Sequence, residues 1–124
     1  MSERKLNTFQ KLSNFLGNKK EKKMYANTTV INVSNAEIAV KLHDTIIVRA
    51  FNNGKFFFDT GGFQTKTTIK RMNECSPFKI FQHKFKLYIA EYVEEKDKFS
   101  WSTYDFFDGM ILDSPKTLPE YLRG

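Results

Sequence analysis

The sequence predicts an α+β protein: a mainly antiparallel, twisted sheet of about six or seven short strands, with one short helix packed on it and an amphipathic helix at the N-terminus. Three observations support this fold class. Aromatic residues are frequent, with 13 Phe, 5 Tyr and 1 Trp in 124 residues, and aromatic side chains favour strands. Several segments alternate apolar and polar residues, which is typical of half-buried strands. Gly, Asn and Pro separate these segments at positions typical of turns.

The first 26 residues are expected to form a basic arm and linker ahead of a single domain at 27–124. Five apolar residues of the arm fall on one side of a helical projection: Leu6, Phe9, Leu12, Phe15 and Leu16. Gly17-Asn18 predicts the end of this helix. A helix this short is marginal alone, so its apolar face should pack on the domain, on a second copy in a homo-oligomer, or on a partner. The lysine-rich residues 19–23 are expected to be a solvated linker.

The domain is expected to consist mostly of strands joined by tight turns. Segments with strand character follow one another at 27–34, 37–42, 45–51, 55–60, 78–81, 85–93, 99–107 and 110–112. Asn53-Gly54 predicts a type I′ hairpin turn, and a second hairpin is expected to turn near Gln82-His83.

One short helix is expected at 67–75, between the strand segments. Thr65 or Thr67 is predicted to cap its first turn, and Gly61 or Gly62 just before it is expected to have positive φ. Pro77 follows the end of the helix. A capping box at 117–120 predicts one last helical turn.

The net charge of +6 is unevenly distributed along the chain. Residues 1–26 carry seven Lys or Arg against two Glu, and residues 61–86 carry six against one. Residues 87–124 carry eight Asp or Glu against four Lys or Arg. Such polarity can steer a polyanion toward the basic segments, or it can let the two halves of the domain attract each other.

Composition also gives an expectation for the compartment. No apolar run approaches the roughly 20 residues that span a bilayer, so no membrane span is predicted. Cys75 is the single cysteine, which suits a reducing compartment. We therefore expect a cytoplasmic protein.

A set of motif residues carries a family resemblance. They are His43, Thr45, Gly61, Gly62, Phe63, Thr65, Thr67, Thr68, Arg71, Met72, Asn73, Phe107, Asp108 and Gly109. This pattern resembles a family of small tailed-bacteriophage accessory proteins, which more often have Trp where this chain has Phe63. The resemblance covers about residues 37–112 and leaves the basic arm outside. It implies a phage accessory protein made in the cytoplasm of the host cell, and it implies no particular activity.

Enzyme chemistry is not favoured by the residues present. His43, Asp44 and Thr45 could supply acid–base chemistry, but a lone His at a strand break is more often structural. Two His and one Cys give no metal-ligand spacing, and Cys75 lacks a base that the sequence can locate. We therefore predict no catalytic residue, no metal and no cofactor, and a protein that is not an enzyme.

Binding of nucleic acid is the leading functional hypothesis. Basic side chains for the phosphates and aromatic rings for the bases are what single strands require. The alternation of 84–89 puts Phe85, Leu87 and Ile89 on the core face and leaves Tyr88 as the natural exposed ring. The predicted binding residues of the arm are Lys19, Lys20, Lys22 and Lys23. Those of the domain are Lys66, Lys70, Arg71, Lys84, Lys86 and Tyr88, with Lys79 nearby.

Two alternatives stay open. The chain could inhibit a host protein or a host defence, with the arm helix binding in a groove of the partner. It could also capture a small anionic ligand, such as a nucleotide signal, at Gly61-Gly62 and the threonine-rich helix start. Arg71 and Asn73 either fasten the helix to the sheet or belong to a site, and we favour the structural role.

Overall fold

The computed structural model describes residues 5–95 and 98–114. The capping box expected at 117–120 lies outside these residues. The elements are α1 (Phe9–Leu16), β1 (Glu21–Tyr25), β2 (Thr28–Ser34), β3 (Glu37–Leu42), β4 (Thr45–Phe51), β5 (Lys55–Phe58), α2 (Lys66–Glu74), β6 (Lys79–His83), β7 (Lys86–Glu95), β8 (Lys98–Asp105) and β9 (Met110–Asp113).

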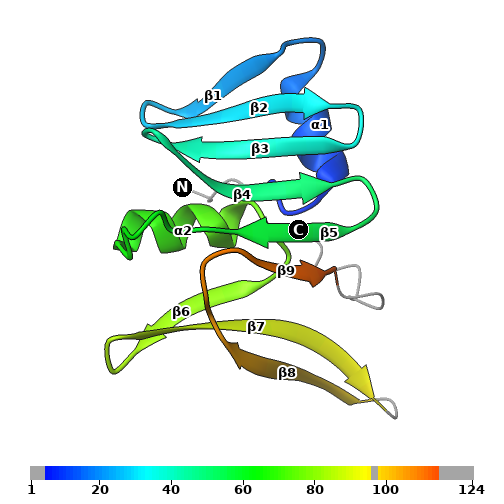
Figure 1. Ribbon diagram of the computed structural model, residues 1–124. Helices are drawn as coiled ribbons and strands as arrows, with labels where there is room; N and C mark the ends of the chain where they lie inside the picture. Colours follow the sequence, from blue (N-terminus) through cyan, green and yellow to red (C-terminus); the bar gives the residue numbers. More distant parts are fainter. Residues whose placement is uncertain (1–4, 96–97, 115–124) are drawn as a thin grey trace.

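The strands form two antiparallel sheets (Figure 1). The larger has the order β1-β2-β3-β4-β5-β9, and the smaller has the order β6-β7-β8. The α+β class is confirmed, but the described residues form nine strands in two sheets instead of six or seven in one. The chain leaves the larger sheet after β5 and returns beside β5 as β9, so the smaller sheet is built from the segment between them.

One hydrophobic core joins both sheets and both helices. The cross-strand partners Val30, Val40 and Val48 are fully buried on one face of the larger sheet. Phe58 of β5 packs edge-to-face on Phe78, with 5.7 Å between the ring centres. Because Phe78 immediately precedes β6, this contact ties the smaller sheet to the larger one.

Helix α1 packs on its own chain. All five apolar residues singled out in the arm contact the core: Leu6, Phe9, Leu12, Phe15 and Leu16. Leu12 and Leu16 are buried, and Gly17 ends the helix as predicted. Of the three alternatives for this apolar face, the structure shows packing on the chain's own domain, with Leu6, Phe9 and Phe15 partly buried. A homo-oligomer or a partner contact through these residues stays a prediction.

The lysine-rich segment that we expected to be a linker is the edge strand β1. Lys22 pairs with Val30 of β2, and Lys23 pairs with Thr29. Met24 of the same strand is buried in the core. Lysines are common on edge strands, where they discourage pairing with another chain. A hydrophilic composition was therefore compatible with an ordered strand.

Both hairpin turns differ from the prediction. A type I′ turn needs positive φ at both central residues, and at Asn53-Gly54 only Gly54 has positive φ, at 92°. The second hairpin turns at Lys84-Phe85 instead of Gln82-His83, with φ of 50° and 66°. Positive φ at both central residues, expected at Asn53-Gly54, thus occurs at Lys84-Phe85, two residues with bulky side chains.

Candidate functional site

Arg71 anchors α2 in the core. Its Nε donates to the Thr28 hydroxyl at 3.0 Å, and its Nη1 pairs with the Glu74 carboxylate at 2.9 Å. Its guanidinium lies 3.7 Å from the centre of the Tyr25 ring, and the Tyr25 hydroxyl donates to Glu74. Arg71 is buried, which corrects its place in the predicted basic patch: a guanidinium with these partners does not face a phosphate.

Three further motif residues also make structural contacts. Asn73 bonds through both atoms of its amide to the backbone of Ile80 in β6. Asp108 accepts from the backbone N–H and the hydroxyl of Thr60, at 2.7 and 3.0 Å. The Gly109 N–H donates to the Phe58 carbonyl at 2.8 Å. These residues fix the position of α2 and of the loops beside it.

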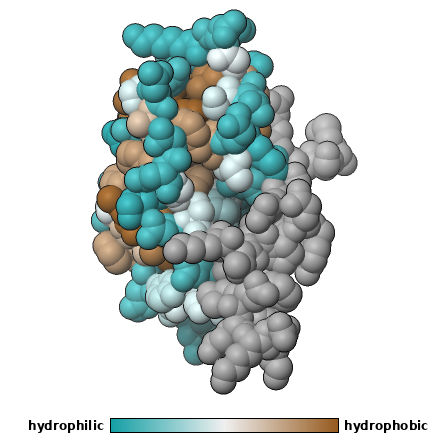
Figure 2. Space-filling view, turned by 90° about the vertical axis from the view of Figure 1, so that its right-hand side faces the viewer, coloured by the Kyte–Doolittle hydropathy of each residue, from teal (hydrophilic) through white to brown (hydrophobic). Residues whose placement is uncertain are grey.

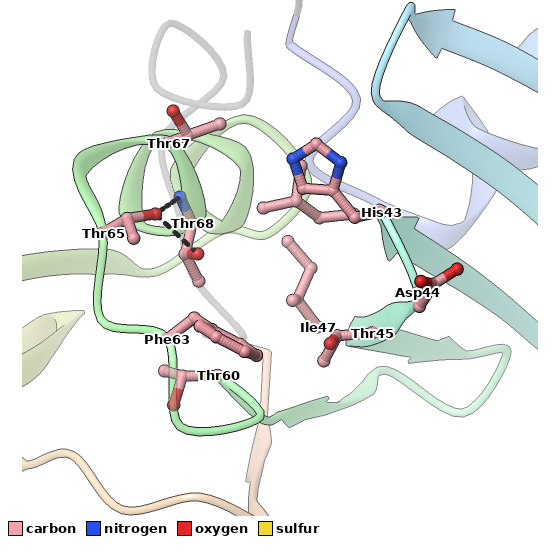
Figure 3. Close-up of a pocket in the computed structure, with 10 residues that line it drawn as sticks. His43, Asp44, Thr45, Ile47, Thr60, Phe63, Thr65, Thr67 and Thr68 are labelled. Atoms are coloured by element: carbon pink, nitrogen blue, oxygen red, sulfur yellow. Dashed lines mark hydrogen bonds between the residues drawn. The ribbon is translucent and has the colours of Figure 1, made fainter.

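Six other motif residues line one pocket of about 410 Å³ (Figure 3). The β3–β4 turn and the start of β4 form one side, and the loop after β5 with the first turn of α2 forms the other. The motif residues that line it are His43, Thr45, Phe63, Thr65, Thr67 and Thr68. Segments that are distant in the sequence therefore meet at this pocket.

Local structure explains how the two sides of the pocket come together. Gly61 has φ of 63°, and a Cβ there would lie 2.7 Å from Cγ2 of Thr45, so only glycine permits this approach. Thr65 caps α2 as predicted, because its hydroxyl accepts from the Thr68 N–H at 3.2 Å. The Thr65 and Thr68 hydroxyls also bond to each other at 3.0 Å. The hydroxyls of Thr65 and Thr68 therefore take part in hydrogen bonds that stabilise the start of α2.

The β6–β7 hairpin presents a second candidate site. Phe81 and Tyr88 are cross-strand partners, and their rings stack with centres 5.6 Å apart. The Lys86 ammonium lies 5.6 Å from the centre of the Tyr88 ring. Lys79, Phe81, Lys86 and Tyr88 share one face because side chains alternate along strands. We call these four residues, together with Lys84 and Phe85 of the turn, the hairpin surface.

Phe85 is the residue of the hairpin surface that sequence reasoning misplaced. We expected it on the core face with Leu87 and Ile89, which are buried as predicted. Phe85 instead occupies the turn and is 94% exposed. The strand alternation begins only at Lys86, so an alternating pattern could not place the residue before it.

The predicted basic residues form separate groups. Lys66 and Lys70 line a groove between α2 and Gln82 of β6, near the end of the smaller sheet that holds the hairpin turn (Figure 1). The arm lysines lie on or beside β1, the strand at the opposite edge of the larger sheet. Lys22 among them donates to the Phe15 carbonyl at 3.1 Å. The arm and the hairpin surface therefore do not form one continuous interface.

Comparison with known protein families identifies this chain. A family model described as Kyanoviridae Gp96 protein matches residues 4–113. The chain belongs to this family. A search among curated proteins and a search among solved structures returned no match. The Gp96 family is a family of phage proteins, so the expected phage origin is confirmed. The match also includes α1 and β1, which corrects the narrower range of 37–112 that the motifs suggested.

The outer face of the larger sheet in this Gp96 family member carries apolar side chains. Ile111 is 55% exposed, and Phe57, its partner on β5, is half-buried. The helices cover the other face, where Leu12 and Met72 enter the core. Figure 2 shows hydrophobic residues reaching the surface among hydrophilic ones.

Cys75 has the environment of a structural thiol. It is fully buried, and burial together with the nearby Glu74 carboxylate raises its pKa to about 12. The thiolate, which is the nucleophilic form, is therefore scarce at neutral pH. Among the described residues, no group of three His, Cys, Asp or Glu is arranged to hold a metal ion, and no helix is long and apolar enough to cross a membrane.

Proposed function

We propose that this Gp96 family member is a non-enzymatic phage accessory protein that binds single-stranded nucleic acid through the hairpin surface, in the cytoplasm of the host cell. The observation that carries the proposal is the position of Phe85. Its ring is 94% exposed in the turn between Lys84 and Lys86, beside the stacked pair Phe81 and Tyr88. Unpaired bases stack on such rings while lysines neutralise the phosphates.

The backbone of the hairpin turn supports a functional role. Lys84 and Phe85 both have positive φ, a conformation that costs a residue with a Cβ about 1–2 kcal/mol. Asn-Gly would form the same turn with less strain. Burial of the Phe85 ring offsets little of this strain energy, because the side chain is almost fully exposed. Strain that folding does not explain is a reason to look for function at that position.

Charge on the hairpin surface also favours a polyanion. It carries Lys79, Lys84 and Lys86, and the described residues offset this charge with one ion pair, between Lys86 and Asp105 at 3.2 Å. Both members of the pair are exposed, and exposed pairs contribute little stability. A phosphate can therefore replace Asp105 at small cost. Trp101 of β8 lies on the same face and is 49% exposed, which extends the surface for further bases.

A protein partner is a second candidate, and a different observation favours it. Ile111 of β9 is 55% exposed and pairs with the half-buried Phe57 of β5 on the outer face of the larger sheet, and neighbouring apolar side chains at a surface can belong to a protein interface. This alternative corresponds to inhibition of a host protein or a host defence. It predicts that the substitution Ile111→Asp abolishes capture of the partner and leaves nucleic-acid binding unchanged.

The test is fluorescence anisotropy with a labelled single-stranded oligothymidine of 15 nucleotides at 50 mM salt. Phe85→Ala and Tyr88→Ala should each weaken binding, since stacking contributes about 1–3 kcal/mol per base. Phe107→Ala is the matched control, because Phe107 is also exposed but lies outside the hairpin surface. Equal affinity of the wild type, Phe85→Ala and Phe107→Ala proteins would reject the hairpin surface as the binding site.

A further inference from the structure

We infer that the pocket between the β3–β4 turn and α2 binds a flat, uncharged heteroaromatic ring with nucleobase chemistry. This site is separate from the hairpin surface. Its volume of about 410 Å³ leaves room for a nucleoside, since ligand pockets typically measure about 300–1,000 Å³. Figure 3 shows Phe63 and Thr67 on the side of α2 and the loop before it, and His43 and Ile47 on the side of β4 and the turn before it.

The apolar part of the pocket favours a flat ring. Leu42 and Ile47 line it and are 6% and 1% exposed, so they form a closed apolar floor. Phe63 lines the pocket at its rim and is 65% exposed. An aromatic side chain in this position offers one open face, on which a planar ligand ring can stack.

The polar part of the pocket favours a ligand that both donates and accepts hydrogen bonds. The side chains of His43, Thr45 and Thr67 make no hydrogen bond with another described residue, and each of these groups can donate and accept. His43 has φ of 53°, an uncommon conformation for a residue other than glycine. Nucleobases alternate donors and acceptors along their edges. The free groups of the pocket match that pattern.

Charge decides against a phosphate as the principal ligand group. No Lys or Arg is among the described residues that line the pocket. The acidic lining residue, Asp44, points its carboxylate away from Phe63 and Ile47 in Figure 3. A phosphate would therefore find no cationic side chain among the described lining residues. The anionic signal considered from the sequence is therefore a poorer fit than an uncharged nucleoside or an unpaired base of a strand.

The test uses NMR titration of the full chain with adenosine, guanosine, cytidine and uridine, each added separately. At least one should shift the amide signals of Phe63 and Thr67 in a saturable manner. Phe63→Ala should weaken that affinity about tenfold, because it removes a stacking surface, and Phe107→Ala, with a similar exposure of 62%, should not. A melt of both variants checks that they remain folded.

Further arms of the titration identify the source of the base. The 5′-monophosphate of the best nucleoside should bind more weakly than the nucleoside itself, and tighter binding would overturn the uncharged ligand class. If a single-stranded oligonucleotide displaces the nucleoside, the pocket takes a base from a strand. If it does not, the pocket takes the free nucleoside. Absence of saturable shifts with all four nucleosides, or an unchanged affinity of Phe63→Ala, would overturn the proposal.

Discussion

The side chain of Asn73 takes the place of a neighbouring strand beside Ile80. Its Oδ1 accepts from the Ile80 N–H at 2.7 Å, and its Nδ2 donates to the Ile80 carbonyl at 2.9 Å. β6 is an edge strand of the smaller sheet, and an edge strand has unpaired backbone groups. One amide of α2 thus satisfies both groups of Ile80 and fixes the helix against the sheet that carries the hairpin surface.

The first prediction concerns this contact. Asn73→Ala should lower the free energy of unfolding by about 2 kcal/mol, because it leaves a part-buried donor and acceptor of Ile80 unsatisfied. Asn73→Asp should be intermediate at neutral pH, since a carboxylate still accepts from the Ile80 N–H but cannot donate to its carbonyl. Urea unfolding measures both effects. A stable Asn73→Ala protein would show that the contact does not hold α2 in place.

The second prediction compares the two neighbouring glycines. Gly61 and Gly62 both have positive φ, but only at Gly61 would a Cβ contact another residue, at 2.7 Å from Thr45. Gly62→Ala should cost roughly 1 kcal/mol from backbone strain alone. Gly61→Ala should cost at least about 1 kcal/mol more, because an added methyl in a packed site is destabilising. Equal unfolding midpoints in urea for the two variants would contradict this structure of the pocket wall.

The third prediction concerns the buried pair Arg71 and Glu74. Arg71→Met should destabilise the protein by about 3 kcal/mol, because it leaves a buried carboxylate without its partner. The double variant Arg71→Met with Glu74→Gln should lose less, since the uncompensated charge is then absent. Denaturant melts of the two variants give this comparison. A double variant that is less stable than Arg71→Met would contradict the argument.

The fourth prediction concerns pH and Cys75. Its pKa in the folded chain is about 12, above the value of 9.0 for a free thiol. The stabilisation from the buried thiol is therefore complete below pH 9 and is lost as pH rises from 9 toward 12. The urea midpoint of the wild type should fall more between pH 8 and 10.5 than that of Cys75→Ala. Parallel pH profiles would contradict a buried neutral thiol.

Local signals in the sequence were sufficient for much of the fold. Thr65 was one of two candidates for the cap of α2, because a threonine hydroxyl satisfies free amides where a helix begins, and the alternation of Leu87 and Ile89 identified the core face of β7. β1 was missed because its lysines resemble those of a linker. Its pairing with β2 depends on contacts such as Lys22 with Val30, which composition does not reveal.

The candidate sites depended on relations that a single sequence does not contain. The motif placed His43 and Thr67 in one pattern, but only the folded chain brings them to one pocket. For Arg71 the sequence left both a structural role and a binding role open, and the contacts with Glu74 and Thr28, which support the structural role, join residues far apart in the chain or within one helix turn. Phe85 was misplaced because Lys-Phe is an unusual pair for a tight turn, for which Asn-Gly is the usual signal.

The salt dependence of binding tests the central proposal most directly. The affinity for single-stranded oligothymidine is measured from 50 to 300 mM salt for two variants with the same change in net charge. The first variant replaces Lys79, Lys84 and Lys86 together with Ala. It should reduce the slope of log affinity against log salt by about 2, since each phosphate contact contributes roughly 0.7. The second variant replaces Lys19, Lys20 and Lys23 together with Ala. It should leave the slope unchanged, because these lysines lie away from the hairpin surface. Equal slopes for both variants, or no measurable binding by the wild type at 50 mM salt, would contradict the proposed function.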